Sequence, residues 1–178
     1  MNTDLLDAQE LLAVARLDFE KERYDQALVR LKQASASNEG QIPEVWALLG
    51  AVYGRLRLWA KAQQFLIKFL EARPQSLNER FQLGMTYFDA GDPGKALEVW
   101  QQILQAEKLH PPALYYSGLA SARLGRLAQA LQYCDTVLAQ VAQDNLFHGR
   151  AKELFEQLRA DPRLRPAETG DSTPRKSH

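Results

Sequence analysis

The residues best suited to metal binding or nucleophilic catalysis in this 178-residue chain are three histidines and one cysteine. His110, His148 and His178 have no metal-ligand spacing to one another or to Cys134. Cys134 takes a position where helix periodicity predicts burial, which favours a small core residue over a reactive thiolate. His110 is expected in a linker and His148 on the surface of a helix. The four residues predict neither a metal site nor a nucleophile.

Carboxylates and glycines suggest no catalytic group either. Glu20, Glu22 and Asp25 cluster near a predicted turn, which is most simply a solvated face rather than an acid–base pair. The Gly-Asp-Pro-Gly stretch at 91–94 lacks the preceding strand and the Lys-Ser/Thr ending of a phosphate loop. We therefore expect a protein that is not an enzyme and that uses no cofactor.

Composition narrows the class of partner. The 22 basic and 22 acidic side chains balance, so no strong field draws the chain to nucleic acid. A single cysteine rules out an intrachain disulfide and suits a reducing compartment. The first ten residues are acidic and lack the features of a secretory signal, and no apolar run is long enough to insert into a membrane. These features predict a cytoplasmic protein without nucleic-acid or membrane partners.

Small residues recur with one period along most of the chain. One series, separated by 35, 34 and 34 residues, falls inside predicted first helices: Ala15, Gly50, Gly84 and Gly118. A second series with the same separations falls inside predicted second helices: Ala27, Ala62, Ala96 and Ala130. Glycine and alanine let two helices approach closely at their crossing point. The shared period predicts repeated helix pairs.

Two further positions follow this period. An apolar residue near each turn precedes the second-helix alanine by three: Tyr24, Trp59, Pro93 and Leu127. A residue expected on the buried face follows that alanine by four: Leu31, Leu66, Trp100 and Cys134. Gly91 and Gly125 suit the left-handed residue that ends a helix. The first two turns lack glycine, so we expect them to be strained or closed differently.

The chain resembles the tetratricopeptide repeat (TPR) family in these residues. Residues 43–76 match best, through Trp46, Leu49, Gly50, Tyr53, Ala62 and Pro74. The resemblance implies an all-α, right-handed superhelical stack of antiparallel helix pairs. The predicted divisions are a lead-in at 1–7, a divergent repeat at 8–42, repeats at 43–76, 77–110 and 111–144, a capping helix at 145–160 that starts after Asp144, and a disordered tail at 161–178.

In this family the first helices line a concave groove, so the resemblance also implies a binding surface. In this chain its residues would be Arg16, Phe19, Ala47, Ala51, Gly54, Arg55, Phe81, Met85, Phe88, Tyr115, Leu119 and Arg123. Ala47, Ala51 and Gly54 form a dip between aromatic residues, which could receive an apolar side chain from a peptide or helix. Self-covered surface is the alternative reading of the same residues.

The resemblance favours a protein–protein interaction scaffold or adaptor. A chaperone dedicated to a bacterial secretion or envelope-assembly system, as in type III secretion, is the alternative. The clamp that some TPR co-chaperones use for heat-shock protein tails is absent, because Leu12, Phe81 and Met85 are apolar at the matching positions and only Arg16 is basic. An outer face of the first repeat without a long N-terminal capping helix would permit homo-oligomerisation.

Overall fold

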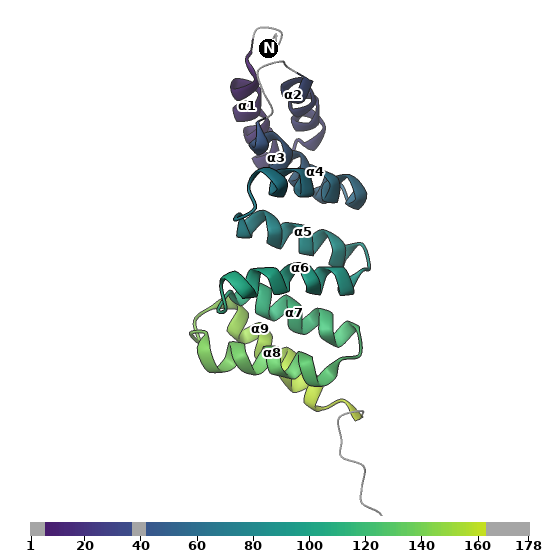
Figure 1. Ribbon diagram of the computed structural model, residues 1–178, viewed down its shortest axis with the longest axis vertical. Helices are drawn as coiled ribbons and strands as arrows, with labels where there is room; N and C mark the ends of the chain where they lie inside the picture. Colours follow the sequence, from purple (N-terminus) through teal and green to yellow (C-terminus); the bar gives the residue numbers. More distant parts are fainter. Residues whose placement is uncertain (1–5, 37–41, 163–178) are drawn as a thin grey trace, which may run out of the picture.

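The computed structural model describes residues 6–36 and 42–162, and within them the chain is helical without strands. The helices are α1 (Ala8–Glu20), α2 (Tyr24–Ala36), α3 (Pro43–Arg55), α4 (Trp59–Ala72), α5 (Leu77–Asp89), α6 (Pro93–Ala106), α7 (Pro111–Arg123), α8 (Leu127–Gln140) and α9 (Leu146–Arg159). They stack along one long axis, with α9 packed against α8 and α7 (Figure 1). The predicted all-α stack of helix pairs is confirmed.

The recurring small residues lie where the helices of a pair cross. All four alanines of the second helices are fully buried. A Cβ on Gly84 would lie 2.2 Å from the indole nitrogen of Trp100, and one on Gly50 would lie 2.6 Å from Cγ of Leu66. Both distances are too short for a side chain. Around Gly118 the nearest atom is 3.4 Å away, so this crossing is looser.

Every helix pair closes with the same turn. In the third pair the Gly91 amide donates to the Phe88 carbonyl at 3.1 Å, and the Asp92 amide donates to the Tyr87 carbonyl at 2.9 Å. This is the Schellman pattern that ends a helix. Glu22, Arg57 and Gly125 take the place of Gly91 in the other pairs, each with positive φ. The first two turns are strained as predicted, but they are not closed differently.

Several helix ends differ from the sequence predictions. Asn145, rather than Asp144, caps α9, because its side chain accepts from the Phe147 amide at 2.9 Å. His110 is no simple linker residue: its Nδ1 accepts from the Ala113 amide at 3.1 Å and so caps α7. The end of the first predicted repeat, at 37–41, and the predicted tail beyond residue 162 lie outside the described residues.

The buried side chains form a core that continues from pair to pair. Leu31, Leu66, Trp100 and Cys134, at one phase of the repeat, are all at most 1% exposed. The first pair is unusual because it also buries a carboxylate, Asp18, which is 1% exposed. Asp18 forms ion pairs with Arg23, at 2.5 Å, and with Arg30 of α2. Burying that charge depends on both partners.

Candidate functional site

The first helices α1, α3 and α5 surround a cavity of about 910 Å³, which we call the inner cavity. Its walls also include the turn after α3 and the start and middle of α4. The lining residues are Phe19, Gly50, Ala51, Gly54, Arg55, Arg57, Trp59, Leu66, Gln82, Met85, Thr86 and Asp89. This volume falls within the usual range of ligand-binding pockets.

Missing side-chain bulk on α3 creates the inner cavity. Nothing lies within 4 Å of the position that a Cβ on Gly54 would occupy, and Ala51, one helical turn earlier, contributes only a methyl group. Gly50 is different, since its missing side chain is filled by Leu66 of α4. The cavity is therefore an open depression above a packed floor.

Of the charged side chains that line the inner cavity, that of Arg55 forms polar contacts with other described residues, whereas those of Arg57 and Asp89 do not. Arg55 Nε donates to the Tyr24 hydroxyl at 3.1 Å, and this hydrogen bond raises the pKa of Arg55. Its guanidinium also lies 3.8 Å from Glu22. The side chains of Arg57 and Asp89 have no ion pair or hydrogen bond with any described residue. Arg57 and Asp89 therefore remain available to a ligand.

Five of the twelve groove residues predicted from the sequence line the inner cavity together: Phe19, Ala51, Gly54, Arg55 and Met85. Another six lie outside its lining: Arg16, Ala47, Phe81, Tyr115, Leu119 and Arg123. Tyr115 packs edge-on against Tyr116 and lies 5.8 Å from Phe147 of α9, and burial raises its pKa. The predicted surface is thus divided: residues of the first three pairs line the inner cavity, whereas Tyr115 of the fourth pair packs against α9.

Phe88 corrects the predicted aromatic wall. Its side chain is 3% exposed and packs 5.7 Å from the Trp100 ring, inside the core. The guanidinium of Arg123 covers the Phe88 ring at 3.7 Å, so this predicted rim cation is engaged in the array itself. Phe81 packs edge-on against Tyr116 at 5.6 Å. The two rings belong to the contact between successive pairs, because α7 covers them.

Sequence reasoning missed several lining residues. The repeat phase assigns Trp59 to packing alone, yet it also lines the inner cavity. Gln82 lies three residues before Met85, and Thr86 directly follows it. Both complete the wall that α5 contributes to the inner cavity. Helical spacing around Met85 would have identified Gln82. Arg57 follows the end of α3 and only the turn geometry directs it to the cavity.

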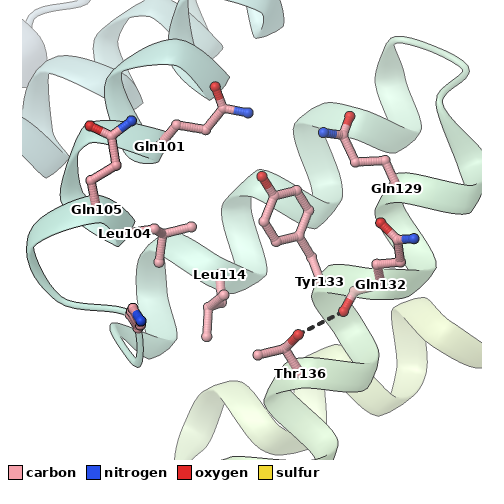
Figure 2. Close-up of a pocket in the computed structure, with 9 residues that line it drawn as sticks. Gln101, Leu104, Gln105, Leu114, Gln129, Gln132, Tyr133 and Thr136 are labelled. Carbon is pink, nitrogen blue, oxygen red and sulfur yellow. Dashed lines mark hydrogen bonds between the residues drawn. The ribbon is translucent and has the colours of Figure 1, made fainter.

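A second depression lies between α6 and α8, and we call it the glutamine groove. Its volume is about 490 Å³, and Figure 2 shows two glutamines from α6 on one side and two from α8 on the other, with Leu104, Leu114 and Tyr133 between them. The lining residues are Gln101, Leu104, Gln105, Lys108, Leu114, Gln129, Gln132, Tyr133 and Thr136. The groove is built mainly on second helices, whereas the inner cavity is built mainly on first helices.

The described residues considered above for catalysis or metal binding lie in surroundings that do not suit either role. Cys134 is fully buried, and burial raises its pKa to about 11, so the thiol stays protonated at neutral pH. Within residues 6–36 and 42–162, no three His, Cys, Asp or Glu side chains come together in a way that could hold a metal ion. No helix in the described part of the chain is long and apolar enough to cross a membrane.

The fold and repeat agree with comparisons to known proteins. Residues 81–145 match the tetratricopeptide repeat family model. No match was found among curated proteins. The solved structure described as YrrB, a TPR protein with an unusual peptide-binding site, is 22% identical with a TM-score of 0.73, covering 82% of this chain and 74% of its own.

Other solved TPR-like stacks agree. A tetratricopeptide repeat protein from Parabacteroides merdae is 21% identical with a TM-score of 0.76, over 85% of this chain and 60% of its own. A MamA protein is 17% identical with a TM-score of 0.71, over 85% of each chain. At these identities the solved structures establish the fold alone. Together with the match of residues 81–145 to the repeat model, they show that this chain has the fold of tetratricopeptide repeat proteins.

Proposed function

We propose that this chain is a non-catalytic interaction scaffold that binds a peptide or helix of another protein in the inner cavity. The observation that carries the proposal is the depression over Ala51 and Gly54, open where a side chain would fit. Its wall joins apolar surface from Phe19, Trp59 and Met85 to charged groups. A bulky apolar side chain of the partner would fill the depression and remove apolar surface from water.

The free charges indicate which side chains would flank that apolar anchor. Arg57 has no partner among the described residues, and its planar guanidinium suits a carboxylate. Arg55 stands beside it, held by Tyr24. We infer that the bound segment carries an acidic residue close to its apolar anchor. The peptide-binding site named for YrrB, on a similar fold, supports a peptide as the occupant.

A substitution that fills the depression over Ala51 and Gly54 tests this proposal. Gly54→Leu places a side chain where nothing lies within 4 Å, so it would occupy the inner cavity without disturbing the core. Gly149→Leu is the matched control, because Gly149 is also helical with open space around its Cβ position, but on α9. A random dodecapeptide library would be selected on the wild-type protein, and affinities measured by fluorescence polarisation.

We expect selected peptides to carry a bulky apolar residue near an acidic one. Their affinity should fall at least about tenfold for Gly54→Leu, because the anchor loses its pocket. The Gly149→Leu protein should bind as the wild type does. Peptides that bind the Gly54→Leu protein equally well, or a selection that enriches no sequence, would refute the inner cavity as the site.

A further inference from the structure

The glutamine groove contains side-chain amides that the protein itself does not use. Gln101 and Gln105 project from α6, and Gln132 projects from α8 (Figure 2). The amides of these three side chains make no hydrogen bond with any described residue. Gln129 uses only its carbonyl oxygen, which accepts from the Ser121 hydroxyl at 3.3 Å. Most of the groove's donors and acceptors are therefore free.

The spacing of the glutamines matches that of an extended polypeptide. Gln101 and Gln105 are four residues apart on one helix, and Gln129 and Gln132 are three apart on the other. Side chains at these separations lie one helical turn apart, with Cβ atoms about 5–6 Å from each other. An extended chain repeats every two residues, about 6.6 Å, and each edge presents one N–H and one C=O per repeat. A glutamine amide offers the complementary C=O and NH2.

We propose that the glutamine groove binds an extended, uncharged segment of a partner protein through its main chain. Gln101 and Gln105 pair with one edge of the segment, and Gln129 and Gln132 pair with the other. Every second side chain of the segment then rests on Leu104, Leu114 and Tyr133, which lie between the two glutamine pairs (Figure 2).

Two features select this occupant over others. A helix satisfies its own backbone hydrogen bonds internally, so it could not use the glutamine amides in this way. Lys108 is the one ionised side chain among the residues that line the groove. A strongly charged segment would find little charge complementarity there and would lose its hydration.

The probe is an uncharged heptapeptide, acetyl-Ser-Val-Thr-Val-Ser-Val-Thr-amide, titrated into the isotope-labelled full chain. Side-chain amide signals of the four glutamines would be followed by NMR. We expect saturable shifts at these signals. The same peptide with two central amides N-methylated should bind about 20-fold more weakly, because two backbone hydrogen bonds are lost. This comparison uses unaltered protein.

Protein variants provide the second arm. Gln105→Leu combined with Gln132→Leu should weaken binding about 20-fold, since two exposed side chains lose their amides. Gln140→Leu is the matched control, exposed at the end of α8 and outside the groove lining, and should bind normally. The Gly54→Leu protein should also bind the heptapeptide normally, because the inner cavity is separate. These variants therefore show separately whether the inner cavity and whether the glutamine groove bind a ligand.

Three results would overturn the inference. One is the absence of saturable shifts at millimolar heptapeptide. Another is equal binding of the N-methylated peptide, which would show that the main chain is not recognised. The third is concentration-dependent shifts of the same glutamines without peptide, which would mean that a second copy of this chain occupies the groove.

Discussion

The first and second helix pairs contrast at their crossing points. In the second pair, Tyr53 of α3 stacks on Phe65 of α4, with ring centroids 5.6 Å apart and planes 11° from parallel. The same two positions of the first pair, 35 residues earlier, hold Asp18 and Arg30, which form a largely buried ion pair. One backbone arrangement is thus held by a ring stack in one pair and by opposite charges in the other.

The contrast shows that the repeat constrains geometry more than chemistry. The second pair gains stability from apolar burial and stacking, which tolerate changes in pH and salt. In the first pair, the attraction between Asp18 and Arg30 must offset the cost of removing both charges from water. Arg30 retains one buried nitrogen, Nε, without a hydrogen-bond partner in the structure. The first pair should therefore be the more sensitive to single substitutions.

Asp18→Ala should have the largest effect. It leaves Arg30, whose side chain is 19% exposed, without its carboxylate partner, and we expect a loss of about 3 kcal/mol in unfolding free energy. Urea denaturation followed by circular dichroism would measure the loss. Asp25→Ala, an exposed carboxylate in the first turn of α2, is the control and should cost less than about 1 kcal/mol. Equal losses for the two variants would contradict the contrast.

Exchanging the chemistry of the two pairs should have a smaller effect. The double variant Asp18→Tyr with Arg30→Phe installs the ring pair of the second repeat unit in the first. We expect its unfolding free energy to lie within about 1 kcal/mol of the wild type, because apolar replacement of a buried ion pair is often neutral or stabilising. Each single substitution should cost more than the pair. If the two single costs simply add, the positions are not equivalent.

The turns that close the helix pairs allow the same kind of comparison between pairs. Substitutions there should change the free energy of unfolding least. Gly91→Ala should cost about 1 kcal/mol, because alanine is strained at a φ of 88°. Glu22→Gly should gain about 0.5 kcal/mol, since it relieves a non-glycine residue at a φ of 57° and loses only the exposed, 3.8 Å contact with Arg55. Denaturation midpoints would measure both changes.

A glycine in ordinary helix provides the control for the turn series. Gly149→Ala should raise stability by up to about 1 kcal/mol, because Gly149 lies inside α9 with open space at its Cβ position. The sign of the alanine effect should therefore differ between Gly91 and Gly149. The same sign at both positions would show that backbone conformation does not decide the cost.

The periodic residues made the helix pairs predictable from the sequence. Ala62 and Ala96 mark close crossings, and Gly91 marks a left-handed turn residue, so each is readable locally. The Asp18–Arg30 pair was missed, although aligning Asp18 with Tyr53 at one period would have shown a charge at a buried position. The repeat boundaries remain a prediction, as does binding at the groove residues.

The sequence by itself determined where the helices and turns lie, because a residue repeated every 34 positions meets the same local environment each time. Only the tertiary structure decided which helix surfaces stay open. Phe19 and Phe88 both have the spacing of groove residues, yet Phe19 lines a cavity while α7 and Arg123 cover Phe88. Likewise, Gln101 and Gln129 face one another only because α6 and α8 stack across α7. Packing between successive pairs joins residues whose local sequences are independent, so no local pattern reveals it.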